Sequence, residues 1–316
     1  MARVSWSNPA TMEHAAWLWI PVTLWAAFAQ TLRNTAQRHL TGELGTLGAT
    51  LVRFLYGLPF AVAWVAAVQA WRGEPLPLPP AGFYAWVTLG AVSQIAATAF
   101  LLRVMQERNF ALGVAYSKTE LIQIAIFGLL VLGDPVSAGT AVAVACGTLG
   151  VLLLSPADKK RPLRALVTGW ATRPALIGLA SGTSFALSVI GYRAAALSLE
   201  GASFLVAAAV TLAIAQLIQT LLLGGWLAWR NLPVVRATLR LWRPSLFAGF
   251  MGAAASAGWF TAFAIEPAAH VRTLGLVELL FAYVVSRRVF REKLTALELS
   301  GIALLTVGLA VVTLGR

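Results

Sequence analysis

Charge and cysteine are both scarce in this sequence of 316 residues. Charged side chains make up 11% of it and hydrophobic side chains 59%, whereas charged residues make up about 25% of an ordinary soluble domain. So little charge cannot cover a water-soluble core of this size, and we therefore expect an integral membrane protein. Cys146 is the single cysteine, which excludes an intramolecular disulfide and a cysteine-based metal site.

Several motifs of enzymes and pumps are also missing. The sequence has no Gly-x4-Gly-Lys-[Ser/Thr] phosphate loop and no Gly-x-Ser-x-Gly motif, so we expect neither an ATP-driven pump nor a serine hydrolase. The three histidines are scattered, and we expect no metal and no cofactor. The net charge of +12 does not indicate a nucleic-acid partner, because membrane proteins gather basic residues in cytoplasmic loops.

Long apolar runs predict about ten transmembrane helices, since a hydrocarbon core of about 30 Å needs about 20 apolar residues per helix. In lipid each span must satisfy its own backbone amides, so we expect an all-α fold. Eight or nine spans are the alternative, if a short run lies flat or folds back. We interpret the first run as an uncleaved span rather than a signal peptide. The runs are 14–32, 46–71, 81–106, 110–132, 136–155, 174–197, 202–229, 244–265, 269–290 and 295–315.

Basic residues concentrate on one side of the predicted bundle. Side A, which holds both termini, has four arginines, whereas the other loop arginines and lysines, with Arg33 and Arg38 among them, fall on side B. The positive-inside rule makes side B cytoplasmic, so we expect a multi-pass protein of the plasma membrane (the inner membrane of a bacterium) with both termini outside. The side-A arginines are Arg3, Arg72, Arg193 and Arg316.

The segment 231–243 has an apolar face and a basic one. Leu232, Leu239 and Trp242 fall on one helical face, and Arg236 and Arg240 on the opposite one. This pattern is typical of a short helix on an anionic membrane surface. A merely basic loop is the alternative.

The sequence repeats itself with inversion. A shift of 158 residues places Glu120 on Glu278 and Asp134 on Glu292, so each half contains a glutamate followed by a second acid. Each half has five predicted spans, an odd number, so the second half enters the membrane upside down, as in many transporters. Chance likeness between apolar helices is the alternative. The predicted halves are 1–156 and 157–316.

These features resemble the drug/metabolite transporter superfamily in its ten-helix EamA type. The resemblance is carried by Trp25, by the stretch Leu51-Val52-Arg53-Phe54, and by the two acids that close each half. It implies carriage of small metabolites, often amino acids, without ATP. The sequence departs from the family pattern where proline often follows the first acid, and Arg291 replaces the usual glycine. Family members also usually keep both termini in the cytoplasm. The residues at the proline positions are Leu121 and Leu279.

Charged residues inside the spans are the candidate functional groups, because each is costly in lipid. Glu120 and Glu278 lie near the midplane, at about 1.5 Å rise per residue. Lys118 is two residues from Glu120 and points elsewhere, so each needs another partner. Arg53 is a plausible partner for Glu120. A buried ion pair that only holds helices together is the alternative. The candidate lining positions are Trp25, Gln30, Ser93, Gln94, Tyr116, Gln216, Ser256 and Trp259.

We therefore predict a secondary active transporter, not an enzyme, that exports a small polar or zwitterionic metabolite such as an amino acid by alternating access. Membrane lipid surrounds it, and it acts as a monomer or a homodimer. The sequence leaves proton coupling open, since a nearby cation would keep a buried acid ionised. The alternatives are a membrane-embedded enzyme acting on a lipid-linked substrate, a multidrug carrier of lipophilic cations, and a non-transporting scaffold.

Overall fold

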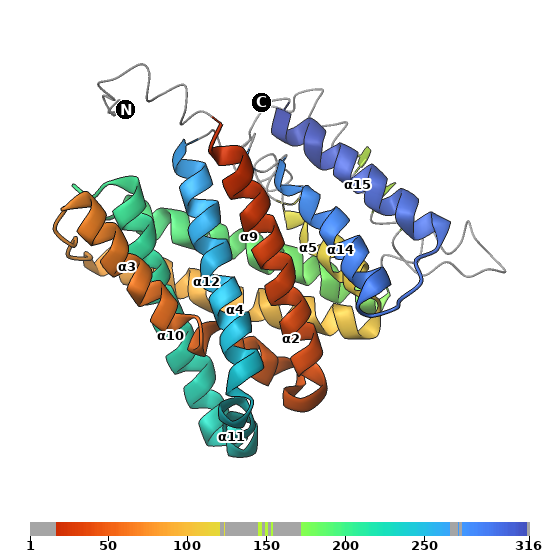
Figure 1. Cartoon of the computed structure of the whole chain (residues 1–316), viewed down its shortest axis with the longest axis horizontal. Helices are drawn as coiled ribbons and strands as arrows, with labels where there is room; N and C mark the ends of the chain where they lie inside the picture. Colours follow the sequence, from red (N-terminus) through yellow and green to blue (C-terminus); the bar gives the residue numbers. More distant parts are fainter. Residues whose placement is uncertain are drawn as a thin grey trace.

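The computed structural model describes residues 17–120, 123, 145–146, 149–150, 153, 172–265, 271 and 274–314. Every element in this part of the chain is an α-helix, as the apolar runs predict (Figure 1). The helices are α2 (Trp19–Leu55), α3 (Leu58–Arg72), α4 (Ala81–Glu107), α5 (Phe110–Ser117), α9 (Arg173–Leu197), α10 (Phe204–Arg230), α11 (Leu232–Arg240), α12 (Trp242–Ile265), α14 (Val277–Arg288) and α15 (Ala296–Leu314).

Within the described residues, four helical segments are long and apolar enough to cross a membrane: Trp19–Arg72, Ala81–Glu107, Arg173–Leu197 and Phe204–Arg230. The outer surface of the bundle is apolar as well. On α3, for example, Val62 is 55% exposed and Trp71 is 76% exposed. Contiguous apolar surface of this kind is stable in lipid and not in water. The chain is therefore a helical membrane protein.

The first helix is longer than the sequence analysis predicts. The polar segment 33–45 was expected to be a loop, but α2 continues through it and breaks at Gly45. Gly45 has φ 66° and ψ 177°, a conformation that glycine adopts without steric cost. The Gln37 Nε2 amide donates to the Ala49 carbonyl at 2.8 Å and so joins the two segments across the break.

Assigning Arg33 to a cytoplasmic loop is therefore wrong. It lies in α2 and is only 3% exposed. Hydropathy marked 33–45 as a loop because its side chains are polar, but on the folded helix several of them point into the protein. Arg38 does lie at the predicted end of the bundle, where it donates to the Met105 carbonyl near the end of α4.

Two long helix pairs make the main contacts of the fold: α4 packs along α9, and α12 packs along α2. At the α4–α9 contact, a Cβ added to Gly191 would lie 2.7 Å from the Gly90 nitrogen and 2.8 Å from the Trp86 carbonyl oxygen. The two backbones therefore touch, which is the usual role of small residues between membrane helices. Gly178 and Gly182 of α9 serve a similar role, because a Cβ added to either would lie within 3 Å of the side chain of Tyr116 or Thr119.

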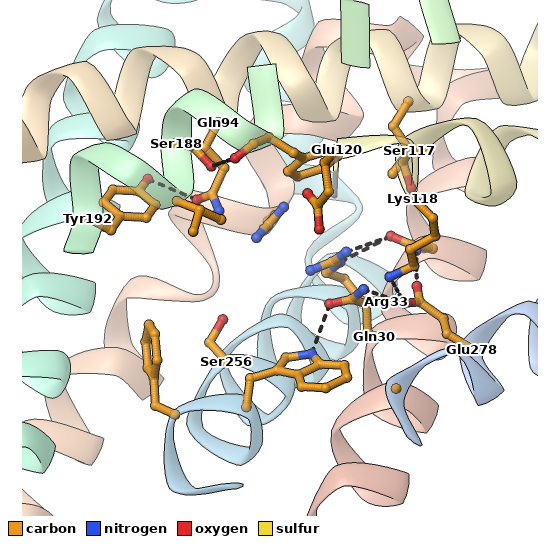
Figure 2. Close-up of a pocket in the computed structure, with 18 of the residues that line it drawn as sticks. Gln30, Arg33, Gln94, Ser117, Lys118, Glu120, Ser188, Tyr192, Ser256 and Glu278 are labelled. Carbon is orange, nitrogen blue, oxygen red and sulfur yellow. Dashed lines mark hydrogen bonds and ion pairs between the residues drawn. The ribbon is translucent and has the colours of Figure 1, made fainter. Parts of the chain in front are cut away.

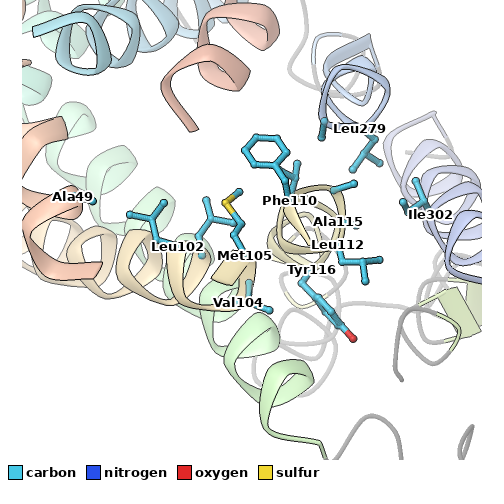
Figure 3. Close-up of a cluster of buried hydrophobic side chains, with 14 of the residues drawn as sticks. Ala49, Leu102, Val104, Met105, Phe110, Leu112, Ala115, Tyr116, Leu279 and Ile302 are labelled. Carbon is cyan, nitrogen blue, oxygen red and sulfur yellow. The ribbon is translucent and has the colours of Figure 1, made fainter. Parts of the chain in front are cut away.

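The short helix α5 lies inside an apolar cluster (Figure 3). All eight of its residues are buried. Its N-terminus is capped twice, because the Asn109 side chain accepts from the Leu112 amide at 3.0 Å and Glu292 accepts from the Phe110 amide at 2.8 Å. Glu292, the second acid of the repeat motif, thus fixes α5. Its counterpart Asp134 lies outside the described residues.

The C-terminal region agrees with three predicted spans in part. Helices α12, α14 and α15 lie within or close to 244–265, 269–290 and 295–315. Residues 232–240 of the segment 231–243 form α11, so its helical interpretation is confirmed there, whereas Trp242 and Arg243 begin α12. Most of the predicted spans 110–132 and 136–155 lies outside the described residues.

Candidate functional site: a charged cavity in the bundle

A cavity of about 210 Å³ lies among α2, α4, α9, α12, α14 and the turn that follows α5 (Figure 2). Its wall combines charged groups, amides and aromatic rings, which is unusual inside an otherwise apolar bundle. The residues that line it are Gln30, Arg33, Asn34, Arg53, Gln94, Leu101, Ser117, Lys118, Glu120, Phe185, Ser188, Val189, Tyr192, Ser256, Trp259, Phe260, Gly275, Leu276 and Glu278.

An ion pair between the Lys118 ammonium and the Glu278 carboxylate crosses one wall of this cavity. The two residues are 160 positions apart in the sequence. Lys118 is the C-cap residue of α5, and Glu278 lies in the first turn of α14. A cation at a helix C-terminus and an anion at a helix N-terminus each complement the helix dipole. Both charges are therefore favoured by their own helix as well as by each other.

Both charges sit next to an interruption in their helix. The chain turns at Lys118 and Thr119 before Glu120, and again at Leu276 before α14 begins. The turns are tight, since the Thr119 amide donates to the Tyr116 carbonyl and the Leu279 amide to the Leu276 carbonyl. Interrupted helices expose backbone and charge at membrane depth in many carriers.

Glu278 is only 1% exposed, and its two oxygens accept from amides as well as from Lys118. The Gln30 amide donates at 2.7 Å and the Asn34 amide at 3.4 Å. Gln30 in turn accepts from the Trp259 indole nitrogen at 3.1 Å. A buried carboxylate needs this full set of donors, because an unpaired charge in a low dielectric costs several kcal/mol.

Two arginines enter the cavity from different segments of α2. The Arg33 guanidinium donates to the Asn34 side-chain oxygen at 2.7 and 3.2 Å. Arg53 donates from Nη1 to the Thr98 hydroxyl at 3.0 Å. Their stems converge on Gly252 of α12, where an added Cβ would lie 3.1 Å from Arg33 Cδ and 3.7 Å from Arg53 Cγ. The break at Gly45 makes this convergence possible, since it turns the second segment of α2 back toward the first.

A third group of polar residues lines the wall formed by α4 and α9. The Tyr192 hydroxyl donates to the Gln94 side-chain oxygen at 3.0 Å, and the Gln219 amide donates to the same oxygen at 2.9 Å. Gln219 also donates to the Tyr192 hydroxyl at 2.9 Å. The triad holds Tyr192 and Gln94 in fixed orientations at the cavity wall.

Glu120 lines the cavity, and its segment packs closely against α9 at Gly182, which has no side chain to keep it away. A Cβ added to Gly182 of α9 would lie 2.5 Å from the Thr119 hydroxyl and 3.2 Å from the Glu120 nitrogen. In Figure 2 the Glu120 side chain points into the cavity toward Arg33. Arg53, which we expected to pair with Glu120, donates the hydrogen bond to Thr98 described above.

The structure brings most of the predicted site residues together. Of the twelve candidate residues named above, Gln30, Ser256 and six others line the cavity. Those six are Glu120, Glu278, Arg53, Lys118, Gln94 and Trp259.

Four predicted lining positions lie elsewhere. Trp25 is 46% exposed on the outer surface, because it precedes Gln30 by five residues and so points about 140° away around the helix. Tyr116 is buried against Gly178 of α9. Ser93 and Gln216 are buried, but neither lines the cavity.

Arg33, Asn34 and Tyr192 line the cavity but were not among the candidates. A signal for the first two was present in the sequence. Arg33 and Asn34 each lie three or four residues from Gln30 and from Gln37, which places the four side chains on one face of a helix. Reading that polar face as a continuation of the first span would have found them. Tyr192 carries no such pattern.

Together the fold and this site define a helical membrane protein with a polar, charged cavity inside it. The fold is similar to that of a solved structure described only as "Crystal structure of protein", with a TM-score of 0.52 and 17% identity over 93% of this chain and 96% of the other. At this identity the likeness concerns the fold alone. No family model and no curated protein matches the sequence.

Proposed function

We propose that the chain is a secondary active carrier that moves a small polar or zwitterionic metabolite, such as an amino acid, through the cavity by alternating access. One observation carries the proposal. Five charged side chains inside the bundle, where charge is expensive, line a single internal cavity. A structural role would require only matched pairs, whereas this site also provides open volume lined by amides and aromatic rings.

The inverted repeat is part of this proposal, and the packing supports it. The 158-residue shift exchanges α2 with α9 and α4 with α12. The contact of α2 with α12 therefore maps onto the contact of α9 with α4, and these are the two main pairs of the fold. The shift also places α3 on residues 216–230 of α10, so the α3–α10 contact joins two equivalent segments. The turns at Lys118 and Leu276 are also 158 residues apart.

Under this proposal the chain has ten spans in two inverted halves, as in EamA-type carriers. The Lys118–Glu278 pair then joins the fourth span of the chain, in the first half, to the ninth span, in the second half. A contact at that position connects the two halves at the cavity, and its making and breaking would change which side of the membrane the cavity faces. We propose export as the direction.

We also propose that both termini lie outside the cell, because removing Arg33 from the side-B loops leaves their excess of positive charge intact. The test is an Arg236→Cys substitution in α11, in a Cys146→Ser background. A membrane-impermeant maleimide should label position 236 in inside-out vesicles and not in intact cells. Labelling in intact cells would reverse the orientation.

The carrier function is tested by uptake of radiolabelled metabolites into proteoliposomes. We expect uptake that requires no ATP and is lost in Glu278→Gln. The matched control is Glu43→Gln, which changes an exposed glutamate of α2 outside the cavity. Comparing uptake with and without a pH gradient, in the wild type and in Glu120→Gln, tests proton coupling. Absence of flux for every metabolite tested, with the protein folded, would argue against a carrier.

A further inference from the structure

We propose that the transported molecule carries one net negative charge and is held by a carboxylate between Arg33 and Arg53. This inference rests on the proposed carrier function and names its substrate class. It starts from the charges on the cavity wall. The described lining residues include three cations, Arg33, Arg53 and Lys118, and two carboxylates, Glu120 and Glu278.

The excess of one positive charge does not depend on how the groups pair. Lys118 is matched by Glu278. If Glu120 neutralises one arginine, the other arginine still has no carboxylate among the described lining residues. Protonation of either glutamate would increase the positive excess. A buried cation without a counter-ion is costly, so the cavity favours an anion over a neutral molecule or a cation.

The geometry places this excess at the two arginines. Arg33 is 3% exposed and Arg53 is 7% exposed, and both use neutral acceptors in the hydrogen bonds described above. Their stems meet at Gly252, so two like charges enter the same part of the cavity and repel each other. Each guanidinium has five N–H donors, of which these bonds use only a part. An anion at both groups would relieve the repulsion and take the remaining donors.

The size of the charge favours a carboxylate over a phosphate ester. A carboxylate carries one negative charge, which matches the excess, whereas a phosphate monoester carries about 1.5 to 2 at neutral pH. The rest of the wall includes Phe185, Trp259 and Phe260, which suit an apolar or lightly polar remainder. The cavity of about 210 Å³ is smaller than the sites of about 300–1,000 Å³ that hold drug-sized ligands. An acidic amino acid or a small organic acid meets these conditions.

The test measures binding separately from transport. The purified full-length protein in detergent is heated with acids of one net negative charge and with their net-neutral amides at about 10 mM: glutamate with glutamine, aspartate with asparagine, and lactate with lactamide. Lysine and glycerol 3-phosphate are added as a cation and a phosphate ester. A ligand that binds the folded state raises the unfolding temperature. We expect at least one acid to stabilise the protein and its amide not to do so.

Variants locate the binding. Arg33→Gln and Arg53→Gln should weaken binding of that acid about tenfold to a hundredfold, since each removes a charged hydrogen bond. Arg53→Lys keeps the charge and should weaken it less, which serves as the readout if the glutamine variants do not fold. Arg230→Gln is the matched control, because Arg230 is exposed at the end of α10. It should leave binding unchanged.

The outcomes separate this inference from the carrier function. Three results would overturn the carboxylate site. The amides or lysine could raise the unfolding temperature as much as the acids do, the phosphate ester could raise it more than the acids, or no acid could raise it at all. If amides or cations are transported, the carrier function stands and the anion site fails. If acids bind through the two arginines but are not transported, the anion site stands and the carrier function fails.

Discussion

The structure contains ion pairs in very different surroundings, and the contrast between two of them is instructive. In the Lys118–Glu278 pair the side chains are 15% and 1% exposed, and they lie at a cavity inside the bundle. In the Arg103–Glu107 pair they are 45% and 18% exposed, one turn apart on the same helix. Both pairs join an acid and a base at contact distance. Their expected contributions differ because solvent screens one and not the other.

The comparison also separates structure from function. The pair on α4 joins neighbours that the helix already holds together, so it adds little to the fold. The cavity pair joins two helix ends that lie 160 residues apart in sequence, beside the groups proposed to bind substrate. Between these extremes lies Arg108–Glu298 at 2.8 Å, with side chains 22% and 11% exposed. The variants below, from the largest expected effect to the smallest, test whether burial sets this order.

Glu278→Gln should have the largest effect. It leaves the Lys118 ammonium without its counter-ion, and breaking a buried pair from one side costs about 3–5 kcal/mol. Unfolding of the detergent-solubilised protein by heat or denaturant measures the loss. The double variant Lys118→Met/Glu278→Gln should recover much of the stability and still lack transport. A single variant as stable as the wild type would show that the pair is not a structural contact.

Arg108→Gln should have an intermediate effect of about 1–2 kcal/mol, because it removes one charged hydrogen bond in a half-buried place. Glu298 keeps other partners, since it accepts from the Thr295 amide at 2.7 Å and hydroxyl at 3.1 Å as the capping residue of α15. Glu298→Ala should therefore cost more than Arg108→Gln. The same unfolding measurement checks both, and the opposite order would contradict the capping role.

Arg103→Gln should change the stability by no more than about 0.5 kcal/mol, as is usual for exposed pairs four residues apart. Glu107 retains a second contact with Arg173 at 3.3 Å. Added salt should reduce even this small difference, because exposed charges are screened. A loss comparable to that of Glu278→Gln would show that burial does not set the order.

The smallest effect is expected at Glu74, in the loop between α3 and α4. Hydrogen bonds from Ser203, and to a lesser degree from Arg72, lower the pKa of the Glu74 carboxyl. A lowered pKa stabilises the folded state above the pKa of the unfolded chain, and this contribution is lost as the pH falls through the folded-state value. Unfolding temperatures from about pH 6 to about pH 3 should therefore fall slightly less steeply in Glu74→Gln than in the wild type. If the unfolding temperatures of Glu74→Gln and the wild type fall equally with pH, the hydrogen bonds of Glu74 do not contribute to the pH dependence of stability.

Much of the fold could be predicted from the sequence, because its information is local. Apolar runs of membrane length predict the long helices α4, α9 and α10 to within a few residues. The same method failed at residues 33–45, where a helix with one polar face resembles a loop when only hydropathy is averaged. The acids Glu120 and Glu278 could be selected because an isolated charge in an apolar run is conspicuous.

Pairing within the site could not be predicted in the same way. Helix geometry excludes Glu120, two residues away, as the partner of Lys118, but nothing in the sequence shows that the partner is Glu278. Arg33 and Arg53 meet because Gly45 reverses the direction of α2 and Gly252 leaves room for their stems. Such distances depend on how helices pack, and packing is a property of the whole chain.

By itself, the sequence determined that this protein lies in a membrane as a helical bundle and that a few charged residues stand at membrane depth. Those properties follow from composition and periodicity, which each segment carries independently of the others. Only the tertiary structure determined which charges face one another and that the described residues around the cavity include three cations and two carboxylates. That follows because contacts between distant segments exist only after the helices have packed.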